Sequence, residues 1–288
     1  MTTYHFIAEC LSTPWALQPE RMSAYAAVLA HKFAGNEIQA NQAAAPQRAG
    51  GRSGSIAVIP VYGAIMQRSN MINMCDGGTS TQAVSKQLKE ANADDSVSAI
   101  VLDVDSPGGS VYGVSELAAE IRSSKKPVYG IANSLAASAG YWLLSQCVEA
   151  YVTPGGEVGS IGVWQAHEDW SKALEAAGVN VTLISAGKYK TEGHPYGPLS
   201  DESKDFMQSR TNEYYGAFTR DVAKGRNVNV EQVRTGMGEG RVYGADQAKA
   251  SGMVDGVMTF DQLIRRIQGS NTRRQQQNAA RLHLLDLG

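Results

Sequence analysis

A single serine, Ser138, stands among residues small enough to leave its hydroxyl accessible, in the stretch NSLAASAGYW at 133–142. The apolar run around it predicts a helix over residues 136–146. A serine at a helix start, flanked by alanine and glycine, is typical of a nucleophile, because attacked groups approach it closely and the helix N-terminus favours negative charge. The alternative interpretation is a closely packed helix start without chemistry.

A glycine loop, DSPGGS at 105–110, follows a strand predicted over 99–104. Loops at the carboxyl ends of parallel strands form the ligand crevice of α/β proteins, and consecutive glycines let backbone N–H groups face a ligand. The loop therefore predicts an oxyanion hole for acyl transfer. A plain Pro-Gly turn is the alternative, and phosphate binding is less favoured because neither GxxxxGK[ST] nor GxGxxG is present.

The Ser138 hydroxyl needs a base. His167 and His194 are candidates, but neither has a convincing Asp or Glu partner in its local motif. Lys188 and Lys190 follow a strand predicted over 179–185. With a free pKa of about 10.4, roughly one lysine in 2,500 is neutral at pH 7, so burial would have to lower the pKa to about 7–8. Solvated surface lysines are the alternative.

A second hydroxyl, that of Ser160, lies in the stretch GSIGV at 159–163, between strands predicted over 150–153 and 161–165. This hydroxyl is able to form a hydrogen bond that orients a lysine amine. A simple Gly-Ser turn explains the same residues, and the sequence leaves both interpretations open.

The elements that must position these residues alternate between strands and helices from residue 56 onward. Further strands are predicted over 56–62 and 127–132, and helices over 79–93, 111–123, 168–177 and 200–225. Continuous apolar strands alternating with helices indicate an α/β fold with a mainly parallel sheet covered on both faces. A further unit follows, with strands near 241–243 and 253–257, helix 245–250 and a last helix over 259–268.

Composition divides the chain into four parts. Residues 1–34, with a helix over 19–34, are predicted to be an N-terminal appendage, and 35–55, rich in Gly, Ala, Gln and Arg, a flexible linker. Residues 56–268 form the main domain, and the polar tail 269–288 is expected to be mobile.

The overall composition is that of a soluble globular protein, with 288 residues, 43% apolar and 19% charged. A net charge of -2 gives no electrostatic reason to expect nucleic-acid or membrane binding. The three cysteines form no pairable or metal-binding pattern and indicate reduced thiols in a cytosol-like compartment. The five histidines are scattered, so neither a metal nor another cofactor is expected, and no signal peptide or transmembrane segment is predicted.

Six segments in a fixed order resemble the signal peptide peptidase A family of serine–lysine peptidases, whose fold is related to ClpP and the crotonases. They are IAVIPVYGAI (56–65), DSPGG (105–109), SLAASAGY (134–141), GSIGV (159–163), GKYK (187–190) and GRVY…QAK…GMVD (240–255). The resemblance covers residues 56–268 and implies a ClpP/crotonase-like α/β fold of repeated ββα and βα units.

The same resemblance implies a Ser–Lys dyad and its helpers: the nucleophile Ser138, the base Lys190, the oxyanion donors Gly108, Gly109 and Ala139, and the base-orienting Ser160. Lys190 is preferred to Lys188 because the family's base ends the Gly-Lys-Tyr-Lys pattern. If the strand continues, the two lysines point in opposite directions, so only one faces Ser138.

Within this family, the chain resembles the phage prohead (capsid maturation) proteases. It has no predicted membrane anchor, and LSTPWALQPE at 11–20 is similar to the opening of phage portal-associated proteases. The resemblance implies a homo-oligomeric peptidase that cleaves scaffold, head or portal proteins inside an assembling procapsid in the host cytoplasm. The alternatives are a soluble bacterial member that degrades peptides, a crotonase-like acyl-CoA enzyme and an inactive assembly protein.

Overall fold

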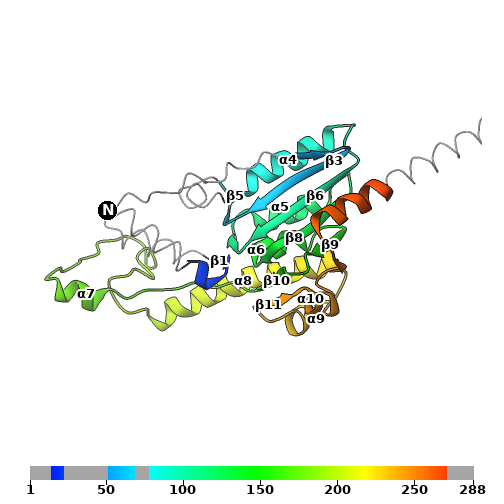
Figure 1. Ribbon diagram of the computed structural model, residues 1–288. Helices are drawn as coiled ribbons and strands as arrows, with labels where there is room; N and C mark the ends of the chain where they lie inside the picture. The colour runs from blue at the N-terminus through cyan, green and yellow to red at the C-terminus, as the bar shows by residue number, and fades with distance from the viewer. Residues whose placement is uncertain (1–13, 23–50, 69–77, 271–288) are drawn as a thin grey trace, which may run out of the picture.

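The strands of a computed structural model form a main sheet in the order β11–β10–β8–β6–β3–β2 (Figure 1). These strands are β2 Gly51–Ser53, β3 Ile56–Tyr62, β6 Ala99–Ser106, β8 Val128–Ala137, β10 Glu157–Gly159 and β11 Val242–Gly244. Strand β9 (Glu149–Val152) also pairs with β8 and carries β12 (Gly256–Val257). The structure describes residues 14–22, 51–68 and 78–270.

The predicted parallel core is confirmed. In the strand order given above, β3, β6, β8 and β10 pair in parallel, and the strands at the two ends, β2 and β11, pair antiparallel with their neighbours. Strand β6 explains why its sequence is a continuous apolar run. Ile100 and Leu102 belong to the larger core cluster, whereas Ala99 and Val101 face a second cluster on the other side of the sheet. Both faces are therefore buried, as successive strand residues point to opposite faces.

Helices cover both faces of this sheet. The larger cluster contains side chains of α4 (Thr81–Ala93), α5 (Val114–Arg122), α6 (Ala139–Leu144) and the long α8 (Asp201–Arg226). The opposite face is covered by a helix over 260–270, through Leu263, Ile264 and Ile267. Helix α9 (Val230–Gly236) was not expected from the sequence, and α10 (Ala245–Ala250) was.

A smaller sheet of the order β1–β7–β4–β5 lies beside the main one. Its strands are β1 Trp15–Leu17, β4 Ile65–Met66, β5 Thr79–Ser80 and β7 Gly108–Ser110. Strand β1, in the predicted N-terminal appendage, is buried and pairs with β7. Strand β2, in the predicted linker, pairs with β3.

The rest of those predictions falls outside the described residues. The helix predicted over 19–34 is seen at 19–22 only, because residues 23–50 lie outside the described ranges, as does the tail 271–288. The four-part division of the chain stays a prediction.

Residues 161–200 leave the sheet as an arm between β10 and α8, with α7 (Ser171–Ala176) far from the sheet (Figure 1). The strands predicted over 161–165 and 179–185 are wrong. The first is reduced to one bridge between Trp164 and Trp15, and the second has no strand pairing and is exposed throughout. Apolar alternation gives a strand only if another strand is present to pair with it, and the described residues supply none there.

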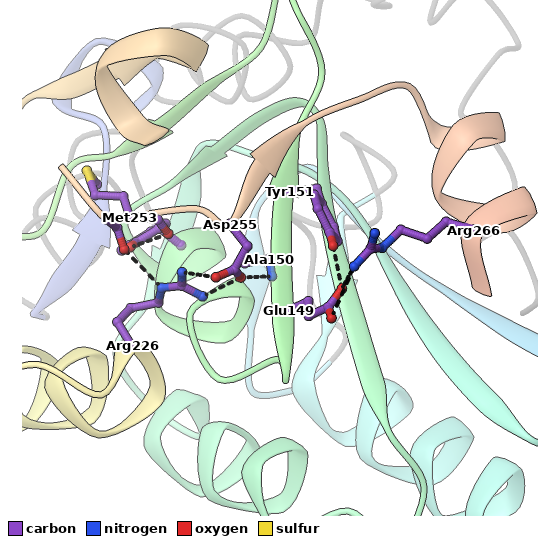
Figure 2. Close-up of polar contacts among 9 residues, drawn as sticks. Glu149, Ala150, Tyr151, Arg226, Met253, Asp255 and Arg266 are labelled. Atoms are coloured by element: carbon purple, nitrogen blue, oxygen red, sulfur yellow. Dashed lines mark hydrogen bonds and ion pairs between the residues drawn. The ribbon is translucent and has the colours of Figure 1, made fainter. Parts of the chain in front are cut away.

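The C-terminal elements are tied to β9 by a group of polar contacts that we call the C-terminal clasp: Arg226, Asp255 and the backbone of Ala150 (Figure 2). The guanidinium of Arg226 forms two hydrogen bonds with Asp255, at 3.0 and 2.9 Å. The Oδ2 atom of Asp255, which accepts one of these two bonds, also accepts a 2.7 Å hydrogen bond from the N–H of Ala150. A neighbouring contact joins Arg266 to Glu149. Within the described ranges, every helix is too short or too polar to cross a lipid bilayer.

Candidate active site

Ser138 occupies the corner between a strand and a helix. Strand β8 runs to Ala137, five residues further than predicted, and α6 begins at Ala139. Ser138 between them has φ 54° and ψ -117°. A positive φ is uncommon for a residue with a side chain, and such strain is concentrated at functional sites, where it aims a side chain. A nucleophile on a sharp strand-to-helix turn is a recurring arrangement in hydrolases.

The backbone of Ser138 is held on both sides. Its N–H donates to the carbonyl oxygen of Gly159 at 2.7 Å, and its own carbonyl accepts from the N–H of Trp142 at 2.9 Å. The Ser138 side chain is buried, with the residue 1% exposed, yet its hydroxyl has no hydrogen-bond partner among the described residues. A fixed backbone with an uncommitted hydroxyl is the state expected of a nucleophile that waits for a base.

Gly108 lies directly against Ser138. Its φ of +107° is unfavourable for other residues, and a Cβ at this position would lie 2.9 Å from the Cβ of Ser138. Its N–H donates to the hydroxyl of Ser106 at 3.2 Å. The neighbouring Gly109 sits between β1 and β4, and a Cβ there would lie 1.8 Å from the carbonyl oxygen of Ile65. Close backbone approach explains both glycines.

Two further predicted site residues, Ala139 and Ser160, also lie next to Ser138. Ala139 is fully buried at the first position of α6, where backbone N–H groups have no acceptor within the helix. Ser160 follows Gly159, whose carbonyl holds the Ser138 N–H, and it has a positive φ of 55°. The N–H of Ser160 donates to the carbonyl of Arg241 at 2.7 Å, which fixes this turn beside the corner.

Lys190 is the predicted residue that the single chain does not bring to this corner. It is exposed on the arm, and its N–H donates to the carbonyl of Gly187 at 3.1 Å. The rival Lys188 bonds both the Tyr189 hydroxyl and Glu202, each at 2.8 Å. These hydrogen bonds, that to Glu202 first, raise the pKa of Lys188, which is the opposite of what a general base requires.

The histidines considered as bases are on the arm as well. The Nε2 atom of His167 lies 3.0 Å from the carbonyl oxygen of His194, so this contact joins two distant parts of the arm. In the described part of the chain, no group of three or more His, Cys, Asp and Glu side chains is arranged to hold a metal ion.

Sequence reasoning missed a buried polar network that contacts α6, the helix that begins directly after Ser138. Asp221 of α8 accepts hydrogen bonds from the indole Nε1 of Trp142 at 3.0 Å and from the hydroxyl of Ser115 at 2.9 Å. Trp142 also stacks on Phe218, with ring centroids 4.4 Å apart. A carboxylate in the middle of a helix carries no signal of its own in one sequence. The apolar residues of the same helix stretch, Phe218 and Val222, were the only hint that this face is buried.

A parallel α/β core, a serine at a strand-to-helix corner and a glycine loop against it define a ClpP-like hydrolase fold, and comparison with known families agrees. The profile of Clp proteases matches residues 55–155, and that of peptidase family S49 matches residues 120–272. The chain therefore belongs to peptidase family S49.

Several curated proteins are similar to this chain. Capsid assembly protease C of Escherichia phage lambda is 34% identical over 212 residues, which cover 73% of this chain and 48% of that protein. Head-tail preconnector protein GP5 of Enterobacteria phage P21 is 30% identical over 287 residues, covering 90% and 56%. A putative signal peptide peptidase SppA of Enterococcus faecium is 34% identical over 172 residues, covering 59% and 50%. The chain thus spans about half the length of these relatives.

Proposed function

We propose that this chain is a serine endopeptidase in which Ser138 is the nucleophile and Lys190 the general base. The observation that carries the proposal is the strained corner at Ser138, with Gly108 against it and the N–H of Ala139 at the start of α6. Peptide hydrolysis needs a hydroxyl on a rigid support and backbone donors for an oxyanion, and this corner offers both.

The mechanism follows from these groups. Neutral Lys190 takes the proton of Ser138 as the Ser138 oxygen attacks a peptide carbonyl carbon. The N–H groups of Ala139 and Gly108 stabilise the resulting oxyanion, and that of Gly108 exchanges its hydrogen bond to the Ser106 hydroxyl for one to the oxyanion. Protonated Lys190 gives that proton to the leaving amine, so the peptide bond breaks and an acyl-enzyme ester remains. Water then hydrolyses the ester, releases the new carboxyl end and restores the Ser138 hydroxyl.

A second copy of the chain is the proposed source of the base. The arm that carries Lys190 also exposes an alternating apolar series, Val179, Val181 and Leu183, followed by Ile184 at 95% exposure. Such a series stabilises a structure only when it is buried against another surface. We therefore assign homo-oligomerisation to the active form, with the arm of one copy delivering Lys190 to Ser138 of another.

Single substitutions test the dyad. In a peptide-cleavage assay, we expect Ser138→Ala and Lys190→Ala each to lower kcat/KM by at least about 1,000-fold, since residues of one catalytic unit fail together. Lys188→Ala is the matched control and is expected to keep activity within a few-fold. Full activity in Ser138→Ala would contradict the proposal, and swapped results for the two lysines would contradict the choice of base.

Mixing the two inactive variants tests where the base comes from. If Lys190 acts on a different copy, mixed Ser138→Ala and Lys190→Ala chains regain part of the activity, because some sites combine an intact serine with an intact lysine. Two inactive variants that stay inactive after being unfolded and refolded together would show that each dyad forms within one chain.

The proposed substrates are capsid proteins, because the similar chains of phages lambda and P21 are named a capsid assembly protease and a head-tail preconnector protein. We propose that the enzyme works inside the assembling procapsid in the host cytoplasm, on scaffold, head or portal proteins. Mass spectrometry of chain ends after co-expression with the neighbouring head genes tests this. New ends that appear with the intact enzyme and not with Ser138→Ala support it, and unchanged ends oppose it.

A further inference from the structure

Strand β1 lies where an extended peptide would lie on entering the candidate active site. On one side it pairs antiparallel with β7, with Ala16 opposite Gly109 and Leu17 opposite Gly108. On its other side, the N–H of Trp15 donates to the carbonyl of Trp164 at 3.0 Å and the N–H of Trp164 donates back at 3.1 Å. Backbone hydrogen bonds along both edges are how a peptide docks by strand addition.

The carbonyl of Ala16 lies close to the nucleophile. A Cβ placed on Gly108 would lie 2.1 Å from the carbonyl oxygen of Ala16 and 2.9 Å from the Cβ of Ser138. Both atoms therefore surround the same small space, which only a glycine leaves open. A carbonyl beside the nucleophile and the glycine loop is in the position of a carbonyl to be attacked.

The side chains of β1 also alternate in the way that a bound peptide's would. Ala16 belongs to the main core and is fully buried, whereas Trp15 and Leu17 are buried in a separate cluster with Met22 and Ala64. The indole Nε1 of Trp164 donates to the carbonyl of Leu17 at 2.8 Å. With β1 in place, Ser138 is 1% exposed, so no second peptide reaches it.

We infer that β1 is an internal occupant of the peptide-binding channel, which runs between β7 and Trp164, and that it blocks Ser138 until it is displaced. This inference rests on the proposed role of Ser138. It also specifies a substrate class: an extended peptide with a small residue in the place of Ala16 and large apolar residues in the places of Trp15 and Leu17.

The test compares two variants that carry the same new charge on neighbouring residues. Leu17→Glu places a charge in the apolar cluster and releases β1, whereas Gln18→Glu places it just after the strand. We expect a fluorophosphonate probe to label Ser138 at least about ten-fold faster in full-length Leu17→Glu than in the wild type, and Gln18→Glu to label at the wild-type rate. Equal labelling of all three would mean that β1 is a fixed wall of the site.

A milder variant covers the case in which Leu17→Glu does not fold. Trp164→Phe removes the hydrogen bond to the carbonyl of Leu17 and keeps an aromatic ring, so labelling should rise by a few-fold. A synthetic peptide of residues 12–20 should slow the labelling of either released variant, and the same peptide with leucine in place of Ala16 should not. Equal effects of the two peptides would overturn the inference about the small residue.

The proposed function and this inference fail in different ways. Labelling that persists after Ser138→Ala, or no labelling of any variant, contradicts the role of Ser138. Labelling that depends on Ser138 but is as fast in the wild type as in Leu17→Glu contradicts the internal occupant alone.

Discussion

Gly108 has a backbone conformation and a place in the fold that only glycine satisfies. Its φ of +107° disfavours any side chain, and the space beside its Cα is shared by the Ala16 carbonyl and the Ser138 side chain. The absence of a Cβ therefore leaves a space between the Ala16 carbonyl and Ser138, and in the proposed mechanism a substrate carbonyl approaches Ser138 through this space.

We expect Gly108→Ala to lower kcat/KM by at least about 100-fold, similar to the loss of one oxyanion donor, because the loop must move away from Ser138. Stability should also fall by about 1–2 kcal/mol, as left-handed backbone is unfavourable for alanine. Peptide cleavage and urea unfolding measure the two effects. Gly155→Ala is the matched control, because a Cβ there meets nothing within 4 Å. Equal activity of the two variants would exclude a role for the close approach.

The corner at Ser138 shows what one sequence reveals about a site. The sequence predicts the small residues around the Ser138 hydroxyl and the glycine loop as parts of a site, because both have unusual local composition. Sequence periodicity predicts Ser138 inside a helix, since an apolar run such as SLAASAGYWLL (134–144) does not distinguish the end of a buried strand from the start of a buried helix. The structure puts the boundary at Ser138 itself.

At the scale of elements, parallel strands and covering helices were predictable because their patterns are long. Strand β1 was not, since three residues carry no periodicity and its partner β7 is distant in the sequence. The strand predicted over 179–185 is wrong for the opposite reason: its alternation is clear, but no strand among residues 14–22, 51–68 and 78–270 pairs with it. Local pattern thus shows which side chains need burial, and the partner that buries them is decided by the tertiary or quaternary structure.

Helix α6 has only six residues, so its position depends on its neighbours. Asp221 supplies the anchor: it binds Trp142 of α6 and Ser115 of α5, and Arg122 lies 3.8 Å from its other oxygen. Because the N–H of Trp142 donates to the carbonyl of Ser138, a shift of this helix moves Ser138, the proposed nucleophile. We therefore regard Asp221 as a positioning residue.

We expect Asp221→Asn to lower kcat by about ten-fold with little change in KM, since substrate contacts are kept while Ser138 moves. It should also cost about 1–3 kcal/mol of stability, as a buried polar group loses part of its partners. Trp142→Phe, which keeps the ring stacked on Phe218, should reproduce the kcat effect. Glu213→Gln, on the exposed side of the same helix, is the control. If these variants lose stability but keep the wild-type kcat per folded enzyme, the network has a structural role and does not position Ser138.

At the scale of the whole molecule, two regions behave differently. The arm leaves the sheet and exposes apolar side chains, which suits an element completed by a second copy. The C-terminal elements instead close the fold upon itself, because Arg226 of α8 and Asp255 before β12 meet at the start of β9 (Figure 2). The side chain of Arg226 is 7% exposed, so its charge depends on Asp255 for compensation.

The C-terminal clasp makes stability depend on pH in a defined direction. Burial acts to raise the pKa of the Asp255 carboxyl, but hydrogen bonds from Arg226 and Ala150, together with the Arg226 charge, outweigh it and hold this pKa below its ordinary value of 3.8. A carboxyl with a lowered pKa in the folded state stabilises the fold fully above the unfolded-state value. That contribution is lost as pH falls through the folded-state pKa.

At pH 7, Asp255→Asn should therefore lower the free energy of unfolding by about 2 kcal/mol relative to the wild type. The reason is that the buried guanidinium of Arg226 loses its charged partner; the loss is moderate because Asp255 itself is partly exposed. The difference should stay constant down to about pH 4 and shrink below it, since protonation then removes the same charge from the wild type. Urea unfolding at pH 7, 5 and 3 measures it. Asp261→Asn, on the exposed face of the helix over 260–270, should change little at any of these values. A difference that remained unchanged at pH 3 would mean that Asp255 acts through shape and not through its charge.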